Sequence, residues 1–160
     1  MTVRRLVLTS AVVGILATAS TTFAQTCEPV SGLFTEHILP KDSAPNDPAG
    51  RVLGNVQGTL QGATTAFLSS LEQKLNGDLH VTTNNVFVTD EGNQLFTRGD
   101  AQWQEILRGF YQVELTLQIV GGTGKYAGAT GSITTLGIGN NVGPGSGQFL
   151  QEYRGQVCTK

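Results

Sequence analysis

The chain has 160 residues, a formal net charge of −2, 39% hydrophobic residues and 14% charged residues. This length accommodates one domain. The mildly acidic balance, without any basic patch, argues against nucleic acid and against an anionic membrane surface as partners.

The first 24 residues have the pattern of a secretory signal peptide. Arg4 and Arg5 precede a short apolar run, which closes on the small residues around Phe23. A charged start, an apolar centre and a small-residue exit are typical of a cleaved signal. A membrane anchor is the alternative, but the apolar run is short and contains Gly, Ser and Thr. We therefore expect cleavage after Ala24, secretion to an extracellular or periplasmic space, and one soluble domain over residues 25–160. That mature chain carries a net charge of −4 and is expected to have no membrane contact.

The two cysteines, Cys27 and Cys158, lie near opposite ends of the mature chain. In an oxidising compartment an even pair placed in this way predicts a disulfide that joins the termini. A metal pair or a catalytic thiol is the alternative, but two thiols are too few ligands for a metal site, and neither His37 nor His80 has metal-finger spacing from them. We expect no metal and no cofactor.

The first half of the mature chain contains extended segments separated by turns. Residues 31–39 predict a first strand, which ends in a proline-containing loop at 40–50. Residues 51–62 predict a strand interrupted by glycines, and residues 63–75 continue as a strand or a short helical turn. Asn76 and Gly77 form a strong tight-turn signal. Residues 79–89 and 94–104 then predict a hairpin around the turn at 90–93, and residues 105–109 a connection.

The clearest strand follows at Tyr111 to Ile119, where apolar and polar residues alternate strictly. Such alternation predicts a half-buried antiparallel strand. Residues 132–138 predict another strand, residues 139–147 a glycine-rich loop, and residues 148–158 the last strand. About eight extended segments, 21 glycines and no convincing amphipathic helix predict an all-β barrel or sandwich.

The glycine motif at residues 121–131, GGTGKYAGATG, resembles a dinucleotide-binding turn only superficially. That chemistry needs a helix directly behind the glycines and an acidic residue about 20 residues later. The residues that follow are glycines and β-branched residues, and no Asp or Glu occurs between Glu114 and Glu152. We therefore expect Gly121, Gly122 and Gly124 to form a sharp turn between adjacent strands, where glycine adopts positive φ without strain.

The same GGTG turn, with the glycine pattern of residues 50–58, resembles the superfamily of dirigent proteins and allene oxide cyclases. The resemblance implies an eight-stranded antiparallel barrel with an interior pocket for a small hydrophobic molecule, often assembled as a homotrimer. Dirigent proteins commonly have an arginine where this chain has Thr130. The pocket residues of the cyclases have no position-by-position match here.

Alternation predicts which side chains line such a pocket. Candidate lining residues, which would face the barrel interior, are Tyr111, Val113, Leu115, Asn85, Phe87, Phe149 and Tyr153. An apolar interior with two phenols and one amide suits a small hydrophobic ligand. Side chains that fill the barrel completely are the alternative. No catalytic residue is identified, and Glu114 is expected on the outer face.

Three hypotheses follow from the sequence. The first is a secreted barrel that binds a small hydrophobic molecule and directs a cyclisation or coupling without a cofactor. The second is a lipocalin-like carrier without catalysis, and the third is a structural or interaction barrel whose interior is packed shut. An ionisable group inside the barrel with a strongly shifted pKa would favour the enzyme over the carrier.

Overall fold

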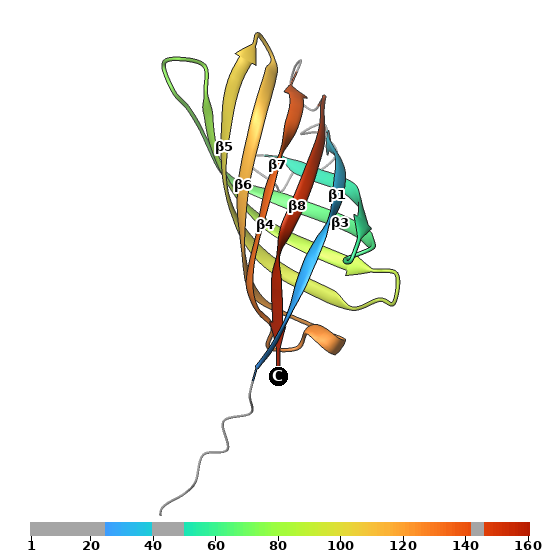
Figure 1. Cartoon of the computed structure of the whole chain (residues 1–160). Helices are drawn as coiled ribbons and strands as arrows, with labels where there is room; N and C mark the ends of the chain where they lie inside the picture. The colour runs from blue at the N-terminus through green and yellow to red at the C-terminus, as the bar shows by residue number, and fades with distance from the viewer. Residues whose placement is uncertain (1–24, 40–49, 142–145) are drawn as a thin grey trace, which may run out of the picture.

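The computed structural model describes residues 25–39, 50–141 and 146–160. They form one closed antiparallel barrel in which each strand pairs with the next along the chain and the last pairs with the first (Figure 1). The predicted all-β, eight-stranded antiparallel barrel is thus confirmed. Its strands are β1 (Thr26–Leu39), β2 (Arg51–Gly58), β3 (Gly62–Gln73), β4 (Leu79–Thr89), β5 (Gln94–Leu107), β6 (Phe110–Gly122), β7 (Thr130–Asn141) and β8 (Gly147–Thr159). Within the described ranges, no helix has the length and apolar character needed to cross a membrane.

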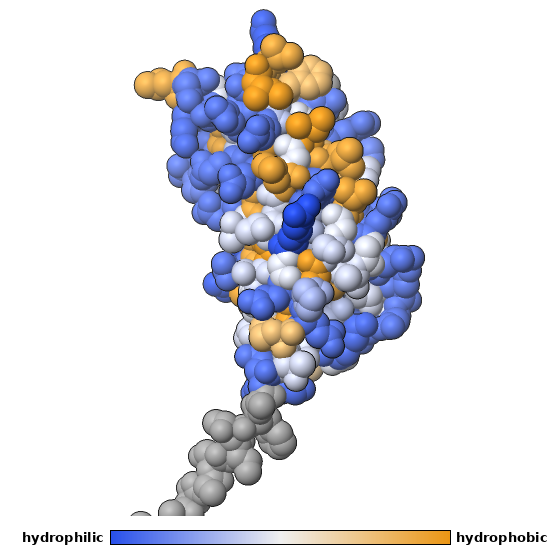
Figure 2. Space-filling view, viewed as in Figure 1, coloured by the Kyte–Doolittle hydropathy of each residue, from blue (hydrophilic) through white to orange (hydrophobic). Residues whose placement is uncertain are grey.

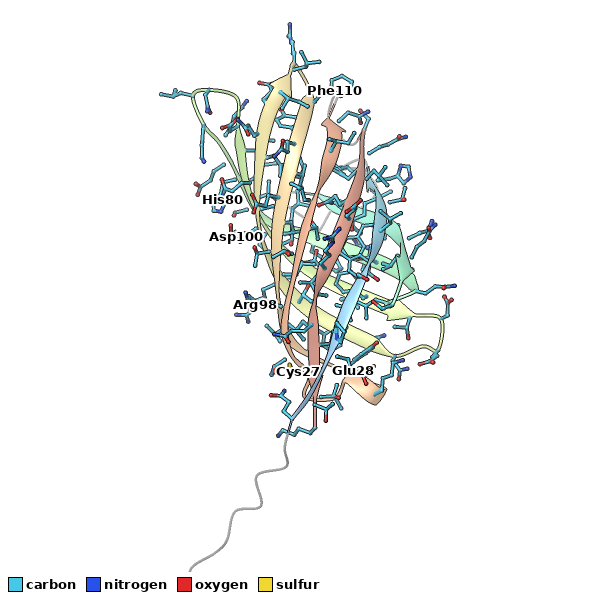
Figure 3. The ribbon with its side chains drawn as sticks, viewed as in Figure 1. Cys27, Glu28, His80, Arg98, Asp100 and Phe110 are labelled. Atoms are coloured by element: carbon cyan, nitrogen blue, oxygen red, sulfur yellow. A yellow bond between two sulfur atoms is a disulfide. The ribbon has the colours of Figure 1, made fainter. Side chains whose placement is uncertain are left out.

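The up-and-down order of the strands gives the barrel two different ends. The β3–β4 and β5–β6 turns lie at one end, which we call the mouth end. The β2–β3, β4–β5 and β6–β7 turns lie at the other, together with both ends of the described chain. We call this the disulfide end. In Figure 3, Phe110 marks the mouth end, and Cys27 and Glu28 mark the disulfide end.

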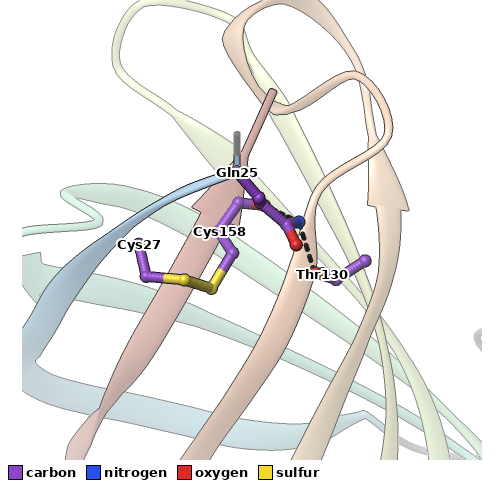
Figure 4. Close-up of a disulfide and its surroundings, with 4 residues drawn as sticks. All are labelled: Gln25, Cys27, Thr130 and Cys158. Atoms are coloured by element: carbon purple, nitrogen blue, oxygen red, sulfur yellow. Dashed lines mark hydrogen bonds between the residues drawn. A yellow bond between two sulfur atoms is a disulfide. The ribbon is translucent and has the colours of Figure 1, made fainter. Parts of the chain in front are cut away.

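The disulfide between Cys27 and Cys158 is present and closes the barrel seam between β1 and β8, as predicted. The two cysteines are direct cross-strand partners in the β1–β8 ladder. The Gln25 side-chain amide donates to Thr130 Oγ1 at 2.6 Å and to the Cys158 carbonyl at 3.2 Å (Figure 4). The bond therefore links the two ends of the described chain across strands that already pair.

The GGTG segment forms the β6–β7 connection, which includes a single turn of 3-10 helix, η2 (Gly124–Tyr126). Gly121 and Gly124 have φ values of 143° and 57°, in the region that favours glycine. Gly122 is needed for a different reason, because a Cβ there would lie 2.2 Å from the Gln94 carbonyl oxygen. The turn folds Tyr126 under the barrel, where it is buried.

Several predicted boundaries were wrong. The strand predicted over 51–62 ends at Gly58, and β3 begins at Gly62, so a turn divides the predicted segment. The segment after it, ambiguous in the sequence, is a strand. The loop predicted over 139–147 is also too long, because β7 continues to Asn141 and β8 begins at Gly147. The predicted signal peptide and most of the predicted proline loop lie outside the described residues.

The half of the barrel interior nearer the disulfide end is packed with aromatic side chains. Phe34 stacks on Tyr153 with ring centroids 4.5 Å apart and on Phe87 at 5.4 Å. The Tyr153 hydroxyl accepts a hydrogen bond from the Leu60 backbone N–H at 3.0 Å. Leu60 is itself only 1% exposed, so this hydroxyl satisfies a backbone donor that water does not reach.

Replacing Tyr153 with Phe is expected to lower the free energy of unfolding by about 2 kcal/mol, because the substitution leaves the buried Leu60 N–H without an acceptor. Urea unfolding of the two proteins measures the difference. Tyr111→Phe is the matched control, because within the described residues the Tyr111 hydroxyl accepts no hydrogen bond from a backbone N–H. Equal losses in both variants would contradict this role of Tyr153.

Candidate functional site

A pocket of about 310 Å³ opens at the mouth end, and we call it the mouth pocket. Its volume is at the lower limit of the range typical of small-molecule sites. The lining is mainly apolar and comes from the ends of β5, β6, β7, β8 and β1. It consists of Thr35, His37, Ile106, Phe110, Tyr111, Ile138, Gly139, Asn140, Gln148, Phe149 and Leu150.

An aromatic cluster lies at the inner side of the mouth pocket, where Tyr111 and Phe149 form part of its wall and Trp103 packs behind them. Trp103 packs against Phe149 with ring centroids 4.8 Å apart and against Tyr111 at 5.9 Å. The Phe149 ring occupies the space beside Gly139, where a Cβ would lie 2.1 Å from the ring. Phe149 lines both the mouth pocket and a second space deeper in the barrel. Its ring therefore stands between the two.

The second space, which we call the interior cavity, has a volume of about 30 Å³. That is room for one or two water molecules and not for an organic ligand. Apolar side chains of β2 to β6 form most of its wall, and Glu36, Thr83, Asn85 and Gln151 supply its polar groups. Of these two spaces, the mouth pocket is the one large enough for an organic ligand, and the interior cavity is a small, mainly apolar chamber behind it with four polar side chains in its wall.

A hydrogen-bonded chain of three buried side chains from β1, β8 and β7 lies at this chamber. Thr135 Oγ1 donates to Gln151 Oε1 at 2.5 Å, and Gln151 Nε2 donates to Glu36 Oε2 at 3.3 Å. The threonine fixes the orientation of the amide, because it engages the amide oxygen and leaves the NH₂ group directed at the carboxyl group. Glu36, Gln151 and Thr135 are 9%, 3% and 2% exposed.

Glycines on the neighbouring strands make room for this chain. Gly54 is the cross-strand partner of Glu36, and a Cβ at Gly54 would lie 2.6 Å from Glu36 Cγ. Gly137 is the partner of Gln151, and a Cβ there would lie 2.8 Å from Gln151 Cγ. Glu36 and Gln151 thus each lie opposite a glycine on the neighbouring strand, and a larger residue at either glycine would displace the polar side chain.

Burial raises the pKa of the Glu36 carboxyl group from 4.5 to about 7. Desolvation is the cause, because the ionised form loses its hydration in the barrel interior. Among the buried polar residues of the described chain, Glu36 is the one carboxylic acid, and none is basic. A carboxyl group with this pKa is present in both protonation states at neutral pH, as a general acid or base requires.

Two further side chains complete the polar surroundings of the mouth pocket and the interior cavity. Asn85 on β4 donates to Thr97 Oγ1 at 3.1 Å and to Thr83 Oγ1 at 3.0 Å. The pKa of Tyr111 is raised, first by burial and then by the negative charge of Glu105. The Tyr111 phenol therefore stays protonated at neutral pH and can donate a hydrogen bond at the mouth pocket.

The seven predicted lining residues all point into the barrel, but they occupy three different places. Tyr111 and Phe149 line the mouth pocket. Asn85, Val113, Leu115 and Phe149 line the interior cavity. Phe87 and Tyr153 belong to the aromatic packing toward the disulfide end and line neither space.

Glu36 and Gln151, the acid of the site and the amide beside it, were not predicted from the sequence. Glu36 lies two residues after Phe34 on the same strand, and Gln151 lies between Phe149 and Tyr153 at the same spacing. Alternation outward from these aromatic residues places both polar side chains on the inner face. That signal was available in the sequence.

The other titratable residues considered from the sequence lie on the outside. Glu114 is exposed on β6, as expected. His80 contacts Asp100 at 3.1 Å on the outer wall (Figure 3). His37 is exposed and lies at the outer edge of the mouth pocket. None of the three faces the interior cavity.

No protein-family model matches the sequence, and a search of curated proteins found no similar sequence. Among solved structures, a pterocarpan synthase dirigent protein is similar, with 13% sequence identity and a TM-score of 0.35. The match covers 88% of this chain and 89% of that chain.

Proposed function

We propose that this barrel binds a small, neutral, mainly apolar molecule in the mouth pocket and that Glu36 exchanges a proton with it. The observation that carries the proposal is the place of Glu36, which is the direct cross-strand partner of Phe149. Among the residues that the structure describes, Phe149 is the one that lines both the mouth pocket and the interior cavity, and it lies directly beside Glu36. A turn of the Phe149 ring would join the two spaces.

The charges of the interior indicate which ligands are compatible with the site. A carboxylate ligand would meet the Glu36 carboxyl group, whose pKa of about 7 leaves it partly ionised at neutral pH. Within the described residues, no buried basic side chain would offset the two negative charges. Two like charges in such a place repel each other strongly. A neutral molecule with a carbonyl or hydroxyl oxygen avoids this cost and can accept the proton of Glu36.

The chemistry within reach is proton transfer without a covalent intermediate. Protonated Glu36 would donate to a ligand oxygen and take a proton back after the carbon skeleton has rearranged. Gln151 holds the carboxyl group in place, and the apolar wall excludes water. This matches the cofactor-free cyclisation or coupling that the resemblance of the GGTG turn implies.

A carrier without catalysis is the second candidate. It is favoured by the Phe149 ring, which separates Glu36 from the mouth pocket in this structure. The two candidates differ in the pH dependence of ligand binding. A carrier would bind a neutral ligand equally well on both sides of pH 7, whereas direct contact with Glu36 couples binding to its protonation.

We also propose that the protein acts outside the cytoplasm after loss of residues 1–24, and that it assembles as a homotrimer. The disulfide supports an oxidising compartment. Exposed aliphatic side chains on the outer wall that do not line the mouth pocket, Leu33 and Val88 at 39% and 36%, are compatible with self-association. Native mass spectrometry of the secreted protein tests both: a mass that retains residues 1–24 or a stable monomer would count against them.

The neutral dye N-phenyl-1-naphthylamine tests binding, because Trp103 is the only tryptophan of the chain and packs directly against Tyr111 and Phe149, which line the mouth pocket. We expect saturable energy transfer from Trp103 to the dye. Ile138→Asp should weaken binding roughly tenfold or more, since it places a charge in the apolar lining.

Leu136→Asp is the matched control. Leu136 lies two residues away on the same outer face of β7, with a similar exposed fraction of 56% against 61%, and it is not part of the mouth pocket. Dye affinity should be unchanged in this variant. Equal weakening in both variants, or no saturable transfer in the unmodified protein, would contradict the assignment of the site.

A further inference from the structure

Apolar side chains in or beside the turns are buried at one end of the barrel and exposed at the other. At the disulfide end, Leu60 and Tyr126 are 1% and 7% exposed although both lie in turns. At the mouth end, Leu75 of the β3–β4 turn is fully exposed and Leu107 at the end of β5 is 70% exposed. Phe110, at the start of β6, is 46% exposed. The same chain therefore buries apolar turn residues at one end and presents them to the surroundings at the other.

The two mouth-end turns are held together by hydrogen bonds. Asp78 Oδ1 accepts from the Glu105 backbone N–H at 3.0 Å, and Glu105 Oε1 accepts from the Gly109 backbone N–H at 2.9 Å. Gly77 packs against the Glu105 side chain so closely that a Cβ would lie 2.1 Å from Glu105 Oε2. These hydrogen bonds connect the segments that bear the exposed leucines, and the carboxylates of Asp78 and Glu105 are used in making them.

Basic residues adjoin both exposed leucines in the sequence. Lys74 precedes Leu75, Arg108 follows Leu107, and both basic side chains are exposed. In the space-filling view, hydrophobic side chains gather at the mouth end on separate projections with hydrophilic ones between them (Figure 2). Apolar tips next to long cationic side chains suit a lipid surface, where the tips enter the acyl boundary and the cations reach the headgroups.

We propose that the mouth end docks on a lipid–water interface through Leu75 and Leu107, with Arg108 at the level of the headgroups. Lys74 Nζ instead donates to Gln102 Oε1 on β5 at 3.2 Å. A fluid surface is favoured over a protein partner because Leu75 lies in the β3–β4 turn and Leu107 at the end of β5, beside the β5–β6 turn, and these two turns are separate projections of the barrel (Figure 1). Insertion of apolar tips does not require an anionic surface, so the net negative charge of the chain does not oppose it. The proposal differs from the sequence-based expectation of no membrane contact, and the experiment below decides between them.

Docking in this orientation directs the mouth pocket toward the lipid, since Phe110 lines that pocket at the same end. An apolar ligand dissolved in the membrane could then enter the pocket without crossing water. This consequence rests on the proposed function, whereas the docking itself does not.

Sedimentation of the purified protein with phosphatidylcholine vesicles tests the proposal. We expect the unmodified protein to bind, and the Leu75→Ser/Leu107→Ser variant to partition roughly tenfold less or weaker still, because two apolar side chains are lost from the contact. Neither leucine lines the mouth pocket, so dye binding should be unchanged. Loss of vesicle binding with dye binding retained separates this proposal from the proposed function.

The matched control is Leu53→Thr/Val120→Thr. These side chains are 43% and 54% exposed but lie on the strand walls away from the two turns, and the control should bind vesicles like the unmodified protein. Failure of the unmodified protein to bind, or equal binding by the serine variant, overturns the proposal. Self-association without vesicles that the serine variant abolishes would assign the tips to a second copy instead, and would overturn it too.

Discussion

Glu36→Gln is expected to make the protein more stable at pH 8.5 by about 3 kcal/mol while leaving its stability at pH 4 nearly unchanged. Burial raises the pKa of this carboxyl group from 4.5 to about 7 in the folded state. The folded protein therefore holds a proton that the unfolded chain has released between these two values. This contribution to stability is fully present below pH 4.5 and is lost as the pH rises through about 7.

Urea unfolding at a series of pH values measures this effect. The unmodified protein should lose stability between pH 5 and pH 8, and the glutamine variant should show a much flatter profile because its amide does not ionise. Glu114→Gln is the control, since Glu114 is an exposed acid on the outer face, and its removal should change stability by less than about 0.5 kcal/mol. Parallel pH profiles for the unmodified protein and Glu36→Gln would contradict the environment assigned to Glu36.

Removing the Cys27–Cys158 bond is expected to lower the free energy of unfolding by about 4–5 kcal/mol on the chain-entropy model. The reason is the length of the loop that it closes, since the two cysteines are 131 residues apart in sequence. Without the bond, the unfolded chain regains the freedom that a closed loop of this length denies it. The barrel seam itself should survive, because β1 and β8 pair over most of their length.

The Cys27→Ala/Cys158→Ala variant and the unmodified protein, unfolded in urea with and without reductant, measure this effect. Reductant should destabilise the unmodified protein by a similar amount and leave the variant unchanged. The tryptophan emission of the folded variant should match that of the unmodified protein, because Trp103 lies in the mouth half of the barrel, away from the bond. A loss of less than about 1 kcal/mol would show that the bond is not a main constraint on the unfolded chain.

Alternating strands and turn signals predicted an all-β barrel or sandwich, and the resemblance of the GGTG turn implied the eight-stranded barrel. The alternation from Tyr111 to Ile119 assigned the inner face of β6 correctly, because a half-buried strand needs apolar side chains at every second position. The disulfide was predictable because an even pair of cysteines in an oxidising compartment is expected to pair, and their places near the chain ends implied that the first and last strands are neighbours. The inner face of β6 and the disulfide could be predicted because alternating apolar residues and a pair of cysteines each favour one structural interpretation.

Boundaries at glycines were harder to predict, because glycine marks both turns and strands. Gly139 was assigned to a loop, yet it pairs with Phe149 in the β7–β8 ladder. Its lack of a side chain serves the packing of the Phe149 ring and not a turn. A single sequence does not distinguish these two uses of glycine, since the pairing register that reveals them is a property of the folded sheet.

The candidate site was predicted only in part for a related reason. The aromatic residues of the interior follow from alternation, but their division between a packed half and a mouth pocket depends on the barrel's tilt and register. Glu36 was missed because its segment was recognised as a strand without assignment of its inner face. Its pKa is raised by burial, and that burial arises only in the folded sheet, where Gly54 and Phe149 become its neighbours across strands.

A carbon-13 titration of the Glu36 side-chain carboxyl group, with and without saturating N-phenyl-1-naphthylamine, most directly tests whether this acid serves the mouth pocket. We expect a pKa of about 7 in the free protein. With the dye bound we expect a higher pKa, because a ligand in the mouth pocket removes water from the neighbourhood of the acid. A pKa near 4.5, or one that bound dye leaves unchanged, would contradict the proposal that this acid serves the mouth pocket.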